Sequence, residues 1–532
     1  MRATSPWEGN LYTRSLLILL WYTFFGMCAC AQTSTDIPVC PSFGKLICTL
    51  PEVYGINGLQ QKIGPLQGGG MPPGGTGTGH LGGHFETDFI NSLAPLNAAV
   101  GSQLTLLPLG SPGSGLVYVY DPALKTFTAS TVDLGPILTE RANTTGRHKV
   151  RVGFSYQRFS FGTLDGTSIH SLPATFTHVD DANPNEKTGN GVPVQPSNPP
   201  FVNCSIADPP PPGNSNSGLC GFVRDRIDTM TNINLRLNQY TVSATFGLTN
   251  RIDVSLAIPI INVGMDVTSR AAIINNSDTN DHVFTSDPSC SDTPCRHRTF
   301  STVSSASGIG DIVLRAKGVV WGGERAAIAV GADLRLPTGD EQNFLGSGTF
   351  GFTPFAVFSY AARVSPHVNV GYQVNGNSYL AGTISPPDST TTPTTPSRLT
   401  KGHLPNQFLY SGGVDVVLVK KRLAGTFDLI GQRVFNTTRA IVTTKPFRGP
   451  CGPLGPPVPQ PGDANYCTSP APDVSLATLT TPAGSFNITN ASLGAKVRIT
   501  DKFVIFGNAL IKLDDGGLRA KVVPLVGASF GF

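Results

Sequence analysis

The feature that most limits how this chain can fold is an alternation of apolar and polar residues. From Ile252 to Ile260 every second residue is apolar, and Asp253 and Ser255 stand between two pairs of them. Residues 326–336 repeat the pattern. Because successive side chains of a strand point to opposite faces, period-two alternation predicts β-strands with one apolar face. The chain is therefore expected to be all-β.

The last strand distinguishes two kinds of all-β protein. Apolar residues alternate from Leu518 to Phe532, whereas Arg519 and Lys521 fall in the other parity. A soluble β-sandwich also alternates, with its apolar face inward. Many strands, very unequal links and a final strand that ends on Phe532 favour a transmembrane, antiparallel, up-and-down β-barrel in the bacterial outer membrane.

The number of strands is expected to be about 12–14. About twelve clear strands follow Lys149, and weaker candidates at Gln103–Leu107 and Leu116–Tyr120 would make fourteen. Both counts are even, as in bacterial single-chain barrels. Short links near Asn250, Gly322, Arg363 and Asp501 alternate with long polar links at 163–232, 272–307, 380–402 and 437–485. The short links are expected on the periplasmic side, and the long ones are expected to be extracellular loops.

Three regions are expected along the chain. Residues 1–31 resemble a secretory signal peptide, with an apolar run from Leu16 to about Met27 before the small-x-small site Ala29-Cys30-Ala31. An uncleaved anchor is the alternative, although the run is short for a membrane helix. Residues 32–95 are rich in Gly and Pro and form either a flexible periplasmic leader or a plug that enters the lumen. Residues 96–532 are the barrel.

Eight cysteines remain after the signal peptide, in four sequence-local couples. They lie in Pro-, Gly-, Ser- and Asn-rich stretches outside the expected strands. An even count in an exported chain predicts disulfides, and metal binding is the weaker alternative because no couple has CxxC spacing. The disulfide candidates are Cys40 with Cys48, Cys204 with Cys220, Cys290 with Cys295, and Cys451 with Cys467.

Charged residues are expected on the lumen-facing side of the strands, opposite the apolar parity. Adjacent strands can then pair opposite charges, and this set either forms a constriction that selects solutes or simply fills the lumen with satisfied ion pairs. The lumen-facing candidates are Arg151, Asp253, Asp311, Arg315, Lys317, Asp333, Arg335, Lys496, Arg498, Arg519 and Lys521.

One stretch carries a family signature. Gly308-Ile309-Gly310-Asp311 is followed by Leu314-Arg315-Ala316-Lys317, then by Leu336-Pro337-Thr338-Gly339-Asp340 and Leu345-Gly346-Ser347-Gly348. This series resembles the outer-membrane transporter family of the phenol-degradation meta-pathway, a looser relative of the long-chain fatty-acid and aromatic-hydrocarbon uptake barrels. The resemblance implies a barrel that transports solutes. Gly308 and Gly310 can take positive φ where the chain re-enters the sheet, and the Leu336–Asp340 segment is expected to be a strand exit.

The functional expectation follows from what the sequence contains. Charged residues make up only 14% of the chain and the net charge of +4 is spread along it, so no nucleic-acid partner is indicated. No nucleophile elbow, P-loop or dinucleotide motif is found, and neither an enzyme activity nor a cofactor is expected. Expected partners are outer-membrane lipid, a small-molecule solute and the barrel-assembly machinery, through the strand that ends at Phe532. We expect transport of small solutes, hydrophobic or aromatic ones among them; the alternative is a surface scaffold or adhesion barrel that acts through its extracellular loops.

Overall fold

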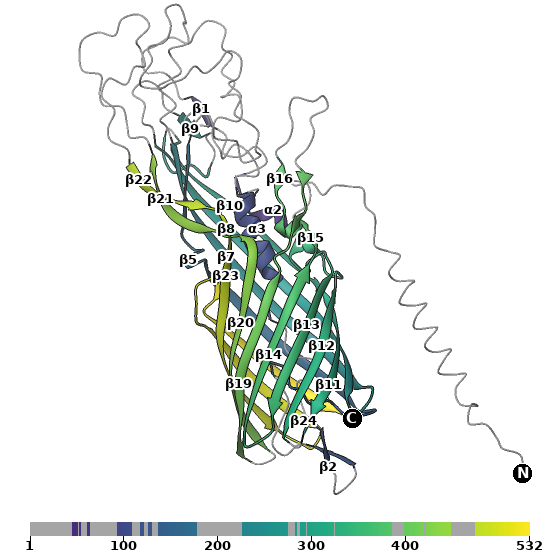
Figure 1. Cartoon of the computed structure of the whole chain (residues 1–532). Coiled ribbons are helices and arrows are strands. Elements are labelled where there is room, and N and C mark those ends of the chain that lie inside the picture. The colour runs from purple at the N-terminus through teal and green to yellow at the C-terminus, as the bar shows by residue number, and fades with distance from the viewer. Residues whose placement is uncertain are drawn as a thin grey trace, which may run out of the picture. The chain divides into compact units, whose positions relative to one another are not determined.

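The computed structural model shows a closed antiparallel barrel (Figure 1). The residues it describes are 45–51, 53–54, 61–63, 93–108, 118–121, 126–129, 137–177, 226–274, 282–284, 288–293, 295–323, 325–385, 398–419, 422–447 and 474–532. Among these residues, no helix is both long and apolar enough to cross a membrane.

Twelve strands form the ring within the described part of the chain. They are β4 (Val150–Leu164), β7 (Arg226–Gly247), β8 (Ile252–Ile274), β10 and β11 as one run (His297–Ile309 and Ile312–Gly322), β12 (Ala326–Leu336), β13 (Gly351–Tyr360), β14 (Val364–Asn375), β19 (Gln407–Val419), β20 (Leu423–Thr438), β23 (Ala483–Arg498), β24 (Phe503–Lys512) and β26 (Val522–Gly531). The ring closes where β26 pairs with β4 and places Leu525 opposite Gln157.

Shorter elements lie at the two ends of the barrel or inside it. The helices are α2 (Leu46–Thr49), α3 (Ala94–Leu104), η4 (Glu341–Asn343) and η5 (Tyr379–Ala381). The short strands are β1 (Gln61–Ile63), β2 (Tyr118–Asp121), β3 (Thr126–Ala129), β5 (Thr167–Ser168), β6 (Leu172–Thr177), β9 (His282–Phe284), β15 (Asn377–Ser378), β16 (Ile384–Ser385), β17 (Arg398–Leu399), β18 (Gly402–His403), β21 (Ile441–Phe447), β22 (Val474–Thr480) and β25 (Leu518–Ala520).

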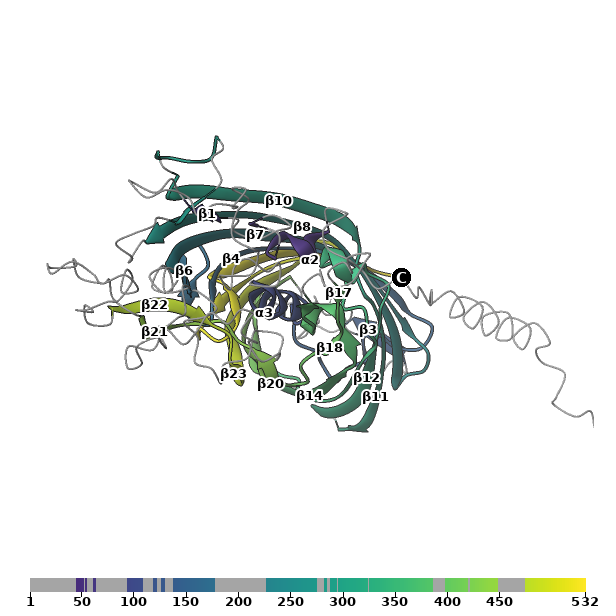
Figure 2. The same cartoon turned by 90° about the horizontal axis from the view of Figure 1, so that it is seen from above.

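The barrel has twelve strands and not fourteen, because neither weak candidate joins the ring. Gln103 and Leu104 end α3, whose Ala- and Leu-rich sequence with a proline in the first turn is typical of a helix. Residues 118–121 form β2, which pairs only with β3. Figure 2 shows α3 inside the outline of the barrel when the ring is viewed from above.

The apolar parity inverts along the longest strands. In β8 the even-numbered side chains are the more exposed ones along the whole strand. As far as Ile260 these are apolar, and Val254 and Ile260 are 42% and 43% exposed. Beyond Ile260 the apolar residues have odd numbers, and Val263 and Met265 are fully buried. From Ile252 to Ile260, here called the lower half, β8 therefore has an apolar outer face. From Ile261 to Ile274, here called the upper half, its inner face is apolar.

This inversion marks where the barrel leaves the membrane. β7 changes in the same way: Val242 and Phe246 are exposed, whereas Leu235 and Leu237 are 1% exposed. An exposed apolar band around a closed barrel is suited to lipid, because lipid solvates apolar side chains and the ring leaves no strand edge unpaired within it. The barrel spans the bacterial outer membrane, and the upper parts of β7, β8 and β10 extend beyond the lipid.

Extension beyond the lipid explains why two of the expected loops are shorter than predicted. Residues 297–307 belong to β10 and 226–232 to β7, although both were expected in long links. The inner face of this extended sheet is covered by α2, whose Leu46 and Ile47 are fully buried in one apolar cluster with Met265 and Val267. The upper strands therefore have a core of their own. The long links lie at the end opposite the short turns, and this end is extracellular.

The disulfide predictions are only partly covered by the described residues. Cys290 and Cys295 form a disulfide beside β10. Cys48, in α2, is also disulfide-bonded. The remaining five candidate cysteines lie outside the described residues, so their pairing stays a prediction. The signal peptide, residues 1–31, also lies outside them.

The inversion predicts different costs for the same substitution on one face of β8. Val254→Arg would place a charge against lipid and should lower the free energy of unfolding by about 2–4 kcal/mol. Thr268→Arg, on the same face above the boundary, should cost less than about 1 kcal/mol. Equilibrium unfolding in urea from phospholipid vesicles measures both. Equal costs would contradict the boundary near Ile260.

Candidate functional site in the barrel lumen

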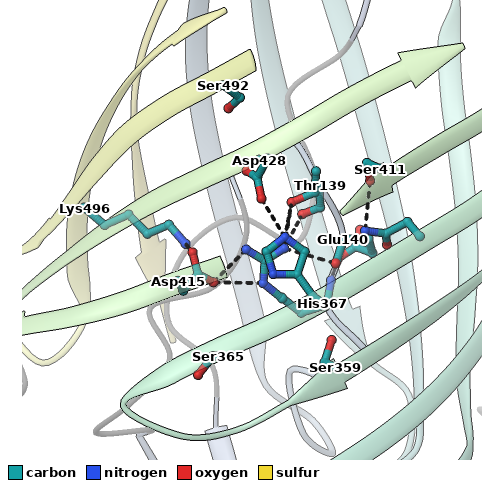
Figure 3. Close-up of polar contacts among 12 residues, drawn as sticks. Thr139, Glu140, Ser359, Ser365, His367, Ser411, Asp415, Asp428, Ser492 and Lys496 are labelled. Carbon is teal, nitrogen blue, oxygen red and sulfur yellow. Dashed lines mark hydrogen bonds and ion pairs between the residues drawn. The ribbon is translucent and has the colours of Figure 1, made fainter. Parts of the chain in front are cut away.

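A segment that precedes the first barrel strand crosses the lumen. Residues 137–145, here called the lumen segment, form no strand or helix and are almost completely buried. Figure 3 shows Thr139 and Glu140 of this segment surrounded by side chains from the barrel wall. The segment is held by polar side-chain contacts instead of strand pairing. No sequence pattern predicted this segment.

Arg141 makes the most deeply buried ion pair of the segment. Its Nε and Nη2 donate to Asp415 Oδ2 of β19 at 2.9 and 2.6 Å. Lys496 Nζ of β23 lies 3.3 Å from the other oxygen, Asp415 Oδ1. All three side chains are at most 3% exposed. One carboxylate thus joins the lumen segment to a cation on the barrel wall.

Glu140 connects the segment to the opposite part of the wall. Its carboxylate contacts Arg315 Nη1, and Lys317 Nζ lies 3.3 Å from Glu140 Oε1. Arg315 also donates to both oxygens of Asp333 at 2.6 and 2.7 Å, across the β11–β12 pair. Lys317 Nζ donates in addition to the carbonyl oxygen of Arg141 at 2.8 Å. The predicted cross-strand pairing of Arg315 and Asp333 is present, and it is completed by a carboxylate from the segment.

His367 of β14 forms a third attachment. Its Nε2 lies 2.6 Å from Asp428 Oδ1 of β20 and 3.2 Å from Thr139 Oγ1 of the segment. Further along the segment, Ala142 N donates to Ser359 Oγ at 3.0 Å and Thr145 N to Asp253 Oδ2 at 2.8 Å. Contacts from strands on several sides of the ring therefore hold the segment in place.

The position of the lumen segment depends on its charged partners in the barrel wall. Buried ion pairs gain little net stability because desolvation offsets the Coulomb attraction, but removing one partner leaves an uncompensated charge. The segment adds a glutamate and an arginine to a wall that carries Arg315, Lys317 and Lys496. Its position is thus set by charge pairing, and leaving that position would not disrupt the strand ladder of the barrel.

The family signature forms a second cluster, nearer the extracellular end. Asp311 accepts hydrogen bonds from Ser347 N at 2.7 Å and Gly339 N at 3.2 Å, and Arg335 Nε lies 3.6 Å away. Thr338 Oγ1 donates to the carbonyl oxygen of Gly310 at 2.7 Å. The Leu336–Asp340 segment is more than a strand exit, because it turns back and binds the break between β10 and β11.

The glycines of the signature allow close packing. A Cβ at Gly346 would lie 2.3 Å from Asp311 Oδ1 and 2.7 Å from the Cα of Gly339. A Cβ at Gly310 would lie 2.8 Å from Ile261 Cδ1. Gly308 and Gly310 do not use their freedom to take positive φ, since neither is among the positive-φ glycines of the described chain. Close approach to neighbouring atoms is the reason for glycine at position 310.

Residues from the expected leader reach the same end of the barrel. Lys45 Nζ, just before α2, donates to Asp340 Oδ2 at 2.8 Å, and the hydroxyls of Tyr54 and Ser269 of β8 are 3.0 Å apart. Partial burial opposes ionisation of Asp340, but hydrogen bonds from Lys45 and Asn343 outweigh it and lower the pKa of the Asp340 carboxyl below its usual value. The described parts of residues 45–54 therefore contact the barrel.

A cavity of about 330 Å³ lies between the end of α3 and the lumen segment. Gln103 and Leu106–Pro108 line it on the helix side, and Leu138–Glu140 line it on the side of the segment. The wall between them is largely apolar, with Phe161, Ile430 and other side chains of the strands. A volume of this size is at the lower end of the range typical of small-molecule pockets.

Several buried polar atoms of the cavity wall have no hydrogen-bond partner within the described chain. They include Gln103 Nε2, Asn369 Oδ1, Gln407 Oε1 and Arg519 Nε. Because an unsatisfied buried polar atom costs about 1–3 kcal/mol, such atoms favour water or a ligand that forms hydrogen bonds. The cavity thus combines apolar side chains with many polar groups, among them the charged side chains of Arg315, Asp333 and Arg335.

The eleven lumen-facing candidates can now be placed. Ten are buried or half-buried; seven are at most 8% exposed, namely Arg151, Asp253, Asp311, Lys317, Lys496, Arg498 and Arg519. Arg315, Asp333 and Arg335 have side chains 12–18% exposed. The prediction for Lys521 is wrong, since Lys521 is exposed. The physical reason is a break between β25 and β26: Leu518 and Ala520 are buried, whereas Val522 is 45% exposed, so the parity shifts at Lys521.

A comparison with protein families agrees with the family signature of residues 308–348. The family model described as "Putative MetA-pathway of phenol degradation" matches residues 231–397, so the predicted resemblance is confirmed. A comparison with curated proteins finds no match.

Among solved structures, the chain is similar to an outer membrane channel from Pseudomonas putida F1, with 9% identity over 74% of this chain and 98% of that one and a TM-score of 0.35. It is also similar to a Pseudomonas aeruginosa FadL homologue, with 8% identity, 80% and 98% coverage and a TM-score of 0.29. The Ralstonia pickettii toluene transporter TbuX has 10% identity, 73% and 90% coverage and a TM-score of 0.24. At these identities and TM-scores the likeness carries no argument, and the fold is assigned from the strand pairing of this chain.

Asp415→Asn tests the buried ion pairs. It leaves Arg141 and Lys496 without their carboxylate and should lower the free energy of unfolding by about 3–5 kcal/mol. Asp501→Asn, at an exposed periplasmic turn, makes the same chemical change and should alter it by less than about 0.5 kcal/mol. Urea unfolding measures both variants. Similar small effects would show that Asp415 is not the anchor of the lumen segment.

Proposed function

We propose that this protein transports small hydrophobic solutes across the outer membrane through the lumen of its barrel. The observation that carries the proposal is the cavity between α3 and the lumen segment, with its largely apolar wall. Its few unpartnered polar atoms favour solutes that also carry a hydrogen-bonding group, for example a hydroxyl on an aromatic ring. The match of residues 231–397 to a phenol-degradation family is consistent with such solutes.

The lumen segment is proposed to be the periplasmic gate. It lies across the lumen below the cavity and is bound by side chains alone, so it can leave without breaking the β-ladder. Residues 32–95 are proposed to be a plug instead of a free leader, in keeping with the contacts of Lys45 and Tyr54 with the extracellular end of the barrel. A solute would then occupy the cavity between two closures.

Loosening the gate should increase permeability. In Glu140→Gln/Arg141→Gln the segment loses its two charges, and single-channel conductance in a planar bilayer should rise several-fold, because a segment no longer paired with the wall leaves the lumen more often. Asp501→Asn/Lys502→Gln, at an exposed turn, removes the same two kinds of charge and serves as control. If the gate variant conducts no more than this control, the lumen segment is not the closure.

Filling the cavity should slow transport. Ile430→Trp adds volume to the cavity wall, whereas Leu429→Trp places the same ring on the outer face, where Leu429 is 41% exposed. Uptake of ¹⁴C-labelled toluene and phenol by cells that make each variant should fall about tenfold or more for the first and stay unchanged for the second. Equal uptake by both variants would rule out the cavity as the route.

The alternative function, a surface scaffold or adhesion barrel, rests on loop residues that lie mostly outside the described part of the chain. It stays a prediction.

A further inference from the structure

On one side of the barrel, the outward residues change from apolar and aromatic to charged just above the lipid. On β4 and β7 the outward residues at the top of the apolar band are aromatic: Phe154 is 47% exposed, and the rings of Tyr156 and Tyr240 are 4.9 Å apart. Aromatic side chains of this kind form the girdle at the edge of the hydrocarbon region. The next outward positions therefore lie at the level of the lipid headgroups.

Three cations occupy that level on adjacent strands. Arg158 on β4 is exposed, and it lies one outward position above Tyr156. Arg236 on β7 is exposed and lies opposite Ser160, the next outward residue of β4. On the other side of β4, Ala520 lies opposite Phe161, which places the exposed Lys521 beside Ser160. Arg158, Arg236 and Lys521, here called the cationic cluster, thus surround Ser160.

The cationic cluster differs from the cations of the lumen. Arg141, Arg315, Lys317 and Lys496 each have a carboxylate within 4 Å. No ion pair is formed by the cationic cluster within the described chain, where Arg236 Nε donates only to the amide oxygen of Asn234 at 3.1 Å. Asp266 of β8 lies diagonally from Arg236, opposite Asn234. The cluster therefore has three positive charges near one carboxylate, on the outer surface of the barrel.

Hydrogen-bonding side chains continue from the cluster across the extended sheet. Tyr156 Oη donates to Asn238 Oδ1 at 2.9 Å, Asn238 Nδ2 to Asn262 Oδ1 at 3.2 Å, and Asn262 Nδ2 to Ser307 Oγ at 2.7 Å. Figure 1 shows the extracellular ends of β7, β8 and β10 rising together above the rest of the barrel. The surface beside the cluster is thus a row of amides and hydroxyls, which suits sugar hydroxyls.

We propose that the cationic cluster binds the phosphate groups of the phosphorylated glycolipid in the outer leaflet of the membrane. Guanidinium groups bind phosphate oxygens in pairs, and basic residues next to a membrane attract anionic headgroups. The acyl chains of that lipid would lie on the apolar surface directly below, on Phe154, Val522 and Val526. The level of the cluster, its charge and the hydroxyl-rich surface beside it together favour a phosphorylated sugar headgroup over a simple phospholipid.

The test is native mass spectrometry of the mature, folded protein in detergent with bisphosphorylated lipid A added. The wild type should retain a bound lipid, and Arg158→Gln/Arg236→Gln/Lys521→Gln should bind it about 100-fold more weakly, in line with the attraction of three basic residues to an anionic surface. The control is Arg251→Gln/Arg363→Gln/Lys502→Gln, which removes the same charges from exposed periplasmic turns and should bind as the wild type does. Heat-modifiable migration in gels confirms that each variant is folded.

Three outcomes would overturn the proposal. Equal weakening in both triple variants would indicate unspecific attraction of anions. Wild-type binding that is as tight for dephosphorylated lipid A, or for phosphatidylglycerol, would show that the cluster does not recognise a sugar phosphate. Release of lipid A by millimolar inorganic phosphate would indicate a site for the free anion. The comparison of the two lipid A forms needs only the wild type, so it decides the proposal even if the variant fails to fold.

Discussion

A β-barrel in lipid must satisfy its polar groups internally, on the inner side of the wall. The exposed side chains of the band include Phe154, Val254 and Val526, so charge gathers inside, and strand pairing alone does not neutralise it. The Arg315–Asp333 pair spans two neighbouring strands, but Arg315, Lys317 and Lys496 obtain further carboxylate contacts from Glu140 or Asp415. Glu140 of the lumen segment thus pairs with two cations of the wall, and Arg141 of the segment pairs with a carboxylate of the wall, so the segment pairs buried charges without adding net charge.

The pairing of buried charges also determines how the lumen segment is held and how it could be displaced. Because the segment is held by ion pairs and hydrogen bonds from several strands, it lies in the lumen without pairing as a strand. The apolar space above it is bounded by α3, whose Gln103 lines the cavity. A closure of this kind can be displaced at the cost of buried charge pairs, whereas the ring, with its continuous ladder from β4 to β26, stays intact.

Much of the fold could be predicted from sequence, and less of the site. Alternation indicated the ring strands because the two faces of each strand have different solvents, and it placed Arg151, Asp253 and Lys496 inside. It failed at Lys521, where the break between β25 and β26 shifts the parity, and at the upper part of β8, where the apolar residues change face. Residues 137–145 have no periodicity to detect. The one available signal was the large excess of predicted lumen cations over carboxylates, which pointed to missing acids such as Glu140 and Asp415.

A reversible cross-link tests whether displacement of the lumen segment opens the barrel. Ala142 N and Ser359 Oγ are 3.0 Å apart, so Ala142→Cys/Ser359→Cys places two thiols where the segment meets β13. With the new disulfide formed, uptake of labelled toluene should stop, and dithiothreitol should restore it to the level of wild type treated with dithiothreitol in the same way, whose native disulfides are exposed to the same reductant. Undiminished uptake by the fully cross-linked protein would show that solutes pass without displacement of the lumen segment.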